Sequence, residues 1–251
     1  MNKIFCIGLS RTGTTSLCQG LELMGIPTAH FSLPLFVKQH ELNPGLQFTP
    51  QIRRTPYGAY RLRKELNVIK SKPLNVLWHK YRAFGDLPFP NFFEELDQKF
   101  PNSQFIYTFR DEHKWLASMK WMLSEGRVIW KWGRADDEIL HFTYGTHRYE
   151  PTKLLKAYWD HHNRIQSYFT SRPNDLLMVN LDKGGLDLNQ IGNFLGTAAP
   201  TQATPRANAA RIAPMKQHLS YWLKQQVPFY ETVTRKILKK PALVPTSASI
   251  L

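Results

Sequence analysis

The stretch GLSRTGTTS, residues 8–16, directly follows the apolar run IFCI, residues 4–7. A buried strand that runs into a loop with two glycines, and then into hydroxyl residues that open a helix, is typical of phosphate-binding loops. Gly8 and Gly13 let the backbone approach an anion closely, because neither carries a Cβ. The N–H groups of the first helical turn then point at the anion, and the helix dipole favours its charge. We therefore predict a binding site for a nucleotide-like phosphate near the N-terminus.

The loop differs from that of nucleoside triphosphatases at the position of its cation. Their pattern is Gly-x-x-x-x-Gly-Lys-Ser/Thr, in which the lysine reaches the terminal phosphates and the hydroxyl holds magnesium. Gly8 and Gly13 keep this spacing, but Thr14 stands at the lysine position. The cation of the loop is Arg11, on the near side of Gly13. Thr15 could still hold magnesium, yet the usual ATP clamp is missing and we expect no metal.

Residues 10–16, SRTGTTS, resemble the 5′-phosphosulfate loop of sulfotransferases, enzymes that use 3′-phosphoadenosine-5′-phosphosulfate (PAPS). That loop usually reads Pro-Lys-Ser-Gly-Thr-Thr, and Arg11 falls on its lysine. Arginine keeps the positive charge but presents a planar fork in place of a point charge. The resemblance implies that the following residues bind the 5′ end of PAPS: Ser10, Arg11, Thr12, Gly13, Thr14, Thr15 and Ser16.

The composition describes a globular chain with a strong basic excess. The chain has 251 residues, of which 42% are hydrophobic and 13% aromatic, enough for a single α/β core. It carries 33 basic and 19 acidic residues, so its formal charge is 33 − 19 = +14. Such a charge attracts polyanionic ligands, although general solubility would explain it equally well. We expect one domain over residues 1–240 and a flexible tail over residues 241–251.

Only two cysteines occur, Cys6 and Cys18, and this number excludes a disulfide framework and a thiolate zinc site. The adjacent His161 and His162 face different sides of a predicted helix, so we interpret them as structural. The first predicted strand starts at residue 3, which leaves no room for a signal peptide. No apolar run approaches the roughly 18 residues of a membrane span. The sequence therefore predicts a cytoplasmic protein without a membrane span and leaves its oligomeric state open.

Apolar strands alternate with helices along the chain. After the first strand, we predict helices at residues 14–24, 91–100, 112–124 and 152–169 and strands at residues 26–31, 81–85, 105–109 and 176–181. This alternation predicts a doubly wound parallel sheet of about four or five strands flanked by helices, similar to the P-loop NTPase fold. Residues 32–73 are rich in proline, contain a basic helix candidate and could form an insertion on the substrate side.

The predicted strand ends gather polar residues at one edge of the sheet. In open parallel sheets, ligands bind beyond the carboxyl ends of the strands. That edge is expected to hold residues 8–15, His30, Asp86 and Arg110. An anion-binding loop, a further cation and two candidates for proton transfer would therefore lie together.

Arg110 ends a predicted strand, and Ser118 follows eight residues later on a helix that Asp111 is expected to cap. Eight residues are a little over two helical turns, so the serine returns to the side of the arginine. The pair resembles the 3′-phosphate site of sulfotransferases, in which a guanidinium and a hydroxyl hold the phosphate. A surface ion pair is the alternative for Arg110 taken by itself.

Asp86 is the candidate general base. The segment Asp86-Leu87-Pro88 stands where many cytosolic sulfotransferases carry His-Leu-Pro with the catalytic histidine, and some branches of that family have Asp-x-Pro. A carboxylate within hydrogen-bond reach can accept the proton of an acceptor hydroxyl. Asp86 could instead cap the turn before the next helix, and His30 and His79 are the alternative bases.

The resemblance covers most of the chain and implies transfer of a sulfuryl group from PAPS to an acceptor hydroxyl or amine, with release of 3′,5′-ADP. Arg11 would act in catalysis by stabilising the leaving phosphate together with the loop N–H groups. The Arg-Lys-Gly segment with which many members bind the 3′-phosphate is not recognisable. The sequence therefore does not identify the residues that bind the adenosine.

The aromatic residues between 115 and 149 would form a lid over a small-molecule, lipid or glycan acceptor, unless they serve ordinary packing. Two other functions remain as alternatives. One is a nucleotide-dependent phosphotransferase built on the same loop. The other is a non-enzymatic module that binds polyanions or nucleic acid through the net charge, although the loop leads us to expect no nucleic acid.

Overall fold

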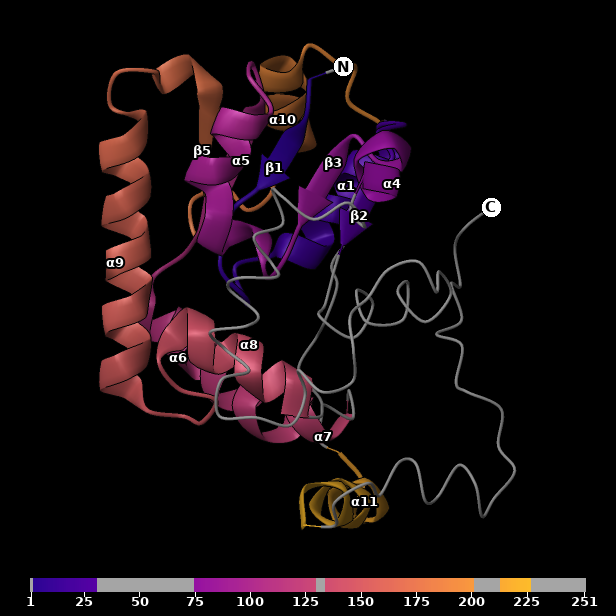
Figure 1. The fold of residues 1–251 in the computed structure, drawn as a ribbon, viewed down its shortest axis with the longest axis vertical. Coiled ribbons are helices and arrows are strands. Elements are labelled where there is room, and N and C mark those ends of the chain that lie inside the picture. Colours follow the sequence, from indigo (N-terminus) through magenta and orange to yellow (C-terminus); the bar gives the residue numbers. More distant parts are fainter. Residues whose placement is uncertain (1, 31–74, 130–133, 201–212, 227–251) are drawn as a thin grey trace.

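The computed structural model describes residues 2–30, 75–129, 134–200 and 213–226. Their centre is a five-stranded sheet in the order β2-β3-β1-β4-β5, and every neighbouring pair of strands is parallel (Figure 1). The strands are β1 (Ile4–Cys6), β2 (Thr28–His30), β3 (Ala83–Gly85), β4 (Gln104–Phe109) and β5 (Leu176–Asn180). The predicted α/β class with a parallel sheet is therefore confirmed.

Helices cover both faces of this sheet. The described helices are α1 (Thr14–Leu23), α4 (Asn75–Lys80), α5 (Phe93–Lys99), α6 (Glu112–Trp121), α7 (Arg127–Ile129), α8 (Arg134–Tyr144), α9 (Pro151–Phe169), α10 (Leu188–Leu195) and α11 (Met215–Gln226). Side chains of α1 and α10 pack on one face, and side chains of α5, α6, α8 and α9 belong to the apolar cluster on the other. The sheet is thus doubly wound, as the sequence predicts.

The first strand shows why the sheet needs two covering layers. Ile4 and Cys6 pack in the same cluster as Leu17 of α1. Phe5 points the other way and packs in the cluster that contains Phe169 of α9. Successive side chains of a strand point to opposite faces, so a run that is apolar throughout must be buried on both sides.

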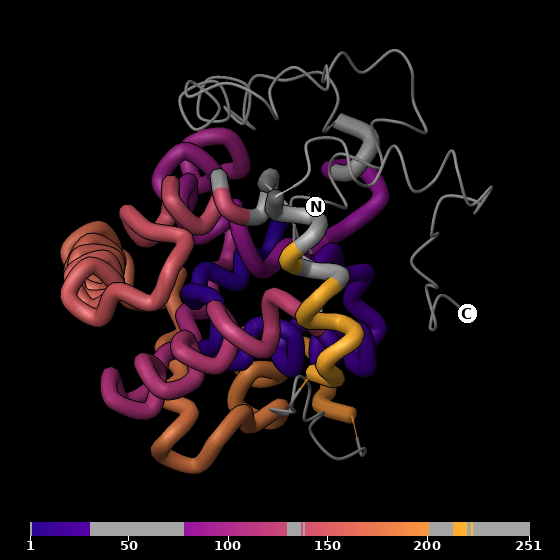
Figure 2. Tube along the Cα trace, turned by 90° about the horizontal axis from the view of Figure 1, so that it is seen from below, coloured from indigo at the N-terminus to yellow at the C-terminus, as the bar shows by residue number. Residues whose placement is uncertain are grey.

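The register aligns the carboxyl ends of β1, β2 and β3, and β4 and β5 run further in the same direction. Cys6 lies opposite both Gly85 of β3 and Ile106 of β4, and Gly85 lies opposite His30 of β2. The chain therefore leaves β1, β2 and β3 at one level, which brings Asp86 beside His30. Helices α6, α7 and α8 lie beyond this edge in Figure 1. Helix α9 runs along one side of the sheet and is seen nearly end-on in Figure 2.

Predicted and observed boundaries differ by a few residues. The helix predicted over residues 91–100 begins as a 3₁₀ turn at Phe89–Phe92 before it continues as α5. The helix predicted over residues 112–124 leaves α-helical geometry after α6 and makes one π-helical turn, Met122–Gly126. The predicted insertion over residues 32–73 and the predicted tail lie outside the described residues. None of the helices in the described ranges combines the length and apolar character that crossing a membrane requires.

Candidate active site

The loop between β1 and α1 is tightly folded against β4. A Cβ at Gly8 would lie 2.2 Å from Thr108 Oγ1 and 2.7 Å from the Thr108 carbonyl oxygen, so only glycine fits there. Gly13 has a φ of 80° and stands at the N-cap of α1, where it offers no side chain to the helix. The first backbone bond of the helix runs from Leu17 N–H to Gly13 O at 2.9 Å. A helix that starts in this way is well suited to an anion at its N-terminus.

Some hydroxyl residues of the loop are buried and support it, and others are partly exposed. Thr12 is fully buried, and its Oγ1 donates to Leu9 O at 2.7 Å and lies 3.1 Å from Thr108 Oγ1. It braces the loop from inside. Thr14 is also buried, whereas Thr15, like Gly13 and Ser16, keeps part of its surface exposed. Thr15 Oγ1 lies 3.1 Å from His30 Nε2, so its hydroxyl faces the end of β2.

Arg11 is fixed by α6. Its Nε donates to Ser118 Oγ at 2.8 Å, and its guanidinium lies 4.8 Å from the centre of the Trp121 ring. Its backbone has a φ of 68°, an uncommon conformation for a residue with a side chain. Burial lowers the pKa of Arg11, and the positive charge of Arg110 lowers it further. A bound anion near Arg11 would favour its charged form.

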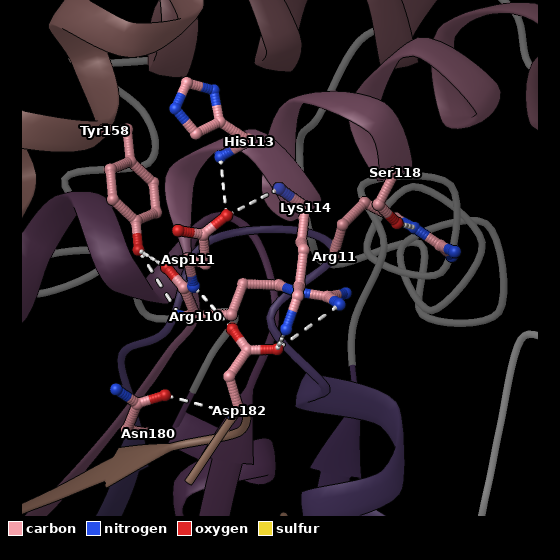
Figure 3. A network of polar contacts seen from close by, with 9 residues as sticks. All are labelled: Arg11, Arg110, Asp111, His113, Lys114, Ser118, Tyr158, Asn180 and Asp182. Carbon is pink, nitrogen blue, oxygen red and sulfur yellow. Dashed lines mark hydrogen bonds and ion pairs between the residues drawn. The ribbon is translucent and has the colours of Figure 1, made fainter.

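Arg110 directly follows β4 and faces the same region (Figure 3). Among the described residues its buried Nε has no hydrogen-bond partner, and one terminal nitrogen lies 3.9 Å from Asp182 Oδ1. A buried donor without a partner is destabilising, and an anionic ligand would supply the missing acceptor. The side chain therefore fits a phosphate-binding role.

Asp182 is a site residue that sequence reasoning missed. Its Oδ2 accepts the N–H of Asp111 at 2.6 Å and its Oδ1 accepts Lys114 Nζ at 3.0 Å (Figure 3). The Asp111 hydrogen bond, followed by the charges of Lys114 and Arg110, keeps the pKa of Asp182 below its usual range. A signal was present, because Asp182 follows the predicted strand 176–181 and the carboxyl end of that strand belongs to the same edge.

Asp111 caps α6 as predicted. Its Oδ1 accepts the N–H groups of His113 and Lys114, each at 3.0 Å. The helix then carries Ser118 toward the β1–α1 loop, where the serine hydroxyl accepts a hydrogen bond from Arg11. The residue that the sequence associates with Arg110 is thus also a direct neighbour of the loop cation.

The two candidate bases lie side by side. His30 Nε2 is 3.5 Å from Asp86 Oδ2, and both side chains are partly buried. Burial raises the pKa of Asp86, while His30 and the Leu87 N–H act in the opposite direction. Asp86 has a φ of 71°, a strained conformation of the kind that clusters at functional sites. His79 is an exposed residue of α4, the helix that leads into the amino end of β3, and so belongs to the opposite edge of the sheet.

The aromatic residues predicted as a lid separate by depth. Trp115 and Tyr144 are buried, whereas Tyr149 is exposed, and Trp130 and Trp132 lie outside the described residues. Both buried rings contact the backbone of Ser10. Tyr144 Oη accepts its N–H at 3.0 Å, and Trp115 Nε1 donates to its carbonyl oxygen at 2.9 Å. These two residues hold the β1–α1 loop in place, a role that sequence reasoning did not assign.

The two cysteines and His161 are further residues of types that can bind metals. Cys6 and Cys18 are buried free thiols. His161 is buried, its Nε2 donates to Ile7 O at 2.8 Å, and burial lowers its pKa to about 4. This confirms that His161 is structural. Within the described ranges, no three His, Cys, Asp or Glu side chains gather in a way that could hold a metal ion.

Comparison with known proteins assigns the family. The family model described as "Sulfotransferase domain" matches residues 3–212.

Two solved structures are similar to this chain. One is a sulfotransferase from Alicyclobacillus acidocaldarius, with 14% identity, a TM-score of 0.45 and coverage of 88% of this chain and 91% of that one. The other is a sulfotransferase domain from the curacin biosynthetic pathway, with 15% identity, a TM-score of 0.44 and coverage of 98% and 94%. No curated protein matches significantly. Because the family model spans well over half of the sequence, the chain belongs to the sulfotransferase family.

Proposed function

We propose that the chain transfers a sulfuryl group from PAPS to a hydroxyl or amine of a small-molecule, lipid or glycan acceptor and releases 3′,5′-ADP. The observation that carries the proposal is that Arg11, in the loop after β1, and Arg110, at the end of β4, belong to one network of polar contacts (Figure 3). A ligand with a phosphate at each of two positions on one ribose is the kind of anion that such a pair suits.

The residues divide between the two ends of the ligand. The loop over residues 10–16 and the N-terminus of α1 would hold the 5′-phosphosulfate. Arg110 and Ser118 would hold the 3′-phosphate, and the unpartnered Nε of Arg110 supports this role. When bound, PAPS supplies the sulfuryl group. As its bond to the 5′-phosphate breaks, Arg11 would stabilise the negative charge that grows on the departing oxygen.

Asp86 is the proposed proton acceptor, and His30 is proposed to orient it. His30 Nε2 lies 3.5 Å from Asp86 Oδ2, and this contact would leave the other carboxylate oxygen for an acceptor hydroxyl. The raised pKa of Asp86 makes its carboxylate a stronger base than an exposed one. His30 as the base is the alternative, since its Nε2 also faces Thr15.

Calorimetry with 3′,5′-ADP, 5′-AMP, ADP and ATP, each in the presence of EDTA, tests the proposal. We expect 3′,5′-ADP to bind most tightly and to do so without magnesium. Equal affinity for 3′,5′-ADP and 5′-AMP would show that the 3′-phosphate is not recognised and would overturn the assignment. If ATP instead binds most tightly, and does so only after magnesium is added in place of EDTA, the result would favour the phosphotransferase.

Labelled PAPS incubated with acceptor extracts would then identify the acceptor class. Transfer of label to a hydroxyl or amine compound is the expected result, and release of free sulfate alone would contradict the acceptor part of the proposal. A cytoplasmic location and a single domain over residues 1–240 remain predictions, which fractionation and limited proteolysis test.

A further inference from the structure

Three buried aromatic side chains from three helices form a row of neighbouring, mutually tilted rings between the two arginine-bearing loops. They are Tyr144 of α8, Trp115 of α6 and Tyr158 of α9, and none is more than 2% exposed. The ring centres lie 6.1 Å apart for Tyr144 and Trp115, and 4.7 Å apart for Trp115 and Tyr158. We call these three residues the aromatic bridge.

One end of the bridge binds the β1–α1 loop. Ser10 N–H donates to Tyr144 Oη at 3.0 Å, and Trp115 Nε1 donates to Ser10 O at 2.9 Å. Both polar groups of the Ser10 backbone are therefore occupied, which fixes the chain direction immediately before Arg11. Since Arg11 adopts a left-handed φ of 68°, this anchoring holds a backbone conformation that the residue would not favour by itself.

The other end binds the loop after β4 in the same manner. Arg110 N–H donates to Tyr158 Oη at 3.3 Å, and Tyr158 Oη donates to Arg110 O at 2.5 Å (Figure 3). One phenol thus occupies both backbone groups of Arg110. The aromatic bridge is therefore hydrogen-bonded to the backbone of Ser10 at one end and to the backbone of Arg110 at the other.

We propose that the aromatic bridge sets the separation of the two arginines, and thereby selects ligands that carry both a 5′-phosphate and a 3′-phosphate. The identity of these ligands rests on the proposed function. The interior is close-packed, so the three neighbouring rings act as a spacer of fixed length. A shift of about 1 Å in a charged group strongly weakens its contact with a ligand. Tyr144, Trp115 and Tyr158 are positioning residues, because they act through the loop backbones.

The two ends of the bridge can be tested separately, because 5′-AMP and 3′,5′-ADP differ only in the 3′-phosphate. Tyr158→Phe removes both contacts to Arg110, so it should weaken 3′,5′-ADP about three- to tenfold and leave 5′-AMP unchanged. Tyr144→Phe removes the acceptor of the Ser10 N–H, so it should weaken both nucleotides by a similar factor. A general loss of stability would not produce this difference between the variants.

Tyr107→Phe is the matched control. Tyr107 is also a buried tyrosine, but its hydroxyl lies 3.0 Å from His162 Nδ1 of α9. Its removal should lower the melting temperature about as much as Tyr158→Phe does, with both affinities unchanged. If Tyr107→Phe weakens the preference for 3′,5′-ADP as much as Tyr158→Phe does, the bridge has no special role and the proposal fails.

Hydrogen exchange of the ligand-free protein separates this proposal from the function on which it rests. Tyr158→Phe should speed exchange in a peptide covering residues 108–114, and Tyr144→Phe should do so over residues 8–16. Unchanged exchange in both peptides overturns the bridge, whatever the ligand. Faster exchange, together with equal wild-type affinity for the two nucleotides, would support the bridge as a brace of the loops and contradict the proposed function.

Discussion

Arg11 and Arg110 are held in position before a ligand arrives. Arg11 is bonded to Ser118 and stacked on Trp121, and the backbone of Arg110 is bound by Tyr158. Cations that are already ordered lose little further freedom on binding, so more of the electrostatic attraction appears as affinity. The site therefore combines two preorganised charges with one unsatisfied donor, Arg110 Nε.

Arg110→Ala should weaken the binding of 3′,5′-ADP without changing that of 5′-AMP. Charge-assisted hydrogen bonds contribute about 1.5–3 kcal/mol, so the dissociation constant should rise about ten- to a hundredfold. Calorimetry measures both ligands. Arg164→Ala is the control, because this arginine pairs with Glu94 at 3.1 Å on the surface. An unchanged constant for 3′,5′-ADP would remove Arg110 from the site.

Asp86→Asn should abolish turnover while leaving the affinity for 3′,5′-ADP intact. The amide cannot accept the acceptor proton, and general bases contribute about a hundredfold or more to rate. Because burial raises the pKa of Asp86, the wild-type rate should increase with pH through a value above that of an exposed carboxyl group. Rate measurements from acid to neutral pH check both points.

Asp160→Asn is the matched control, because Asp160 is an exposed carboxylate that pairs with Lys156 on α9. It should change neither turnover nor affinity. Undiminished turnover in Asp86→Asn would transfer the role to His30, and His30→Gln would then lose the activity.

The sequence predicts the residues of the loop but not those that support it. Arg11 and Arg110 are recognisable because a motif and a strand end mark them. Tyr144 is not, because 134 residues separate it from Ser10 and no local pattern reports which buried tyrosine reaches which backbone. Asp182 lies between these cases, since only its place after a strand could have indicated it.

At the scale of elements, β1, the following loop and α1 pack against β4 as one unit. This packing is possible because Gly8 has no Cβ. The alternation of apolar runs and helices predicts the order of strands and helices, because burial on both faces leaves a sequence pattern. It does not predict the π-helical turn Met122–Gly126, which adds one residue to a turn without changing the composition. That turn begins directly after Trp121, the residue that stacks on Arg11.

Gly8→Ala should destabilise the fold and the loop together. The new Cβ would lie 2.7 Å from the Thr108 carbonyl oxygen, a backbone atom that cannot rotate away. Overpacking of this kind typically costs about 1–3 kcal/mol, which urea unfolding would measure. Gly20→Ala is the control, because the nearest atoms to its new Cβ belong to the Leu188 side chain, the first at 2.6 Å, and not to the backbone. Equal stability of the two variants would refute the tight contact between the loop and β4.

His161 joins α9 to the end of β1, and this contact makes stability depend on pH. Burial lowers the pKa of His161 from its ordinary 6.5 to about 4, so the unfolded chain binds a proton in this range that the folded chain does not. Stability should therefore fall as the pH drops from 6.5 toward 4, by at most about 3 kcal/mol. Urea unfolding of His161→Gln, which removes the titration, should show a shallower fall. Parallel curves for the two proteins would contradict a neutral, buried His161.

At the scale of the whole molecule, the sheet gathers the candidate site residues at the carboxyl edge of its parallel strands. Side chains from separate stretches of sequence meet there, and helices α6 and α8 hold the β1–α1 loop from outside the sheet. The net charge of +14 does not define this site, since the same excess would attract any polyanion.

The salt dependence of ligand affinity should distinguish a defined binding site from a diffuse basic surface. Arg11 and Arg110 are partly buried, and screening acts less on buried charges than on exposed ones. The affinity for 3′,5′-ADP should therefore fall by less than about tenfold between 50 and 200 mM salt. A module that contacts six to ten phosphates of DNA would lose about 10³- to 10⁵-fold over the same range. Calorimetry with 3′,5′-ADP and fluorescence anisotropy with a labelled oligonucleotide measure the two responses. Tight oligonucleotide binding with a steep slope, accompanied by weak binding of 3′,5′-ADP at every salt concentration, would favour the polyanion module over the enzyme.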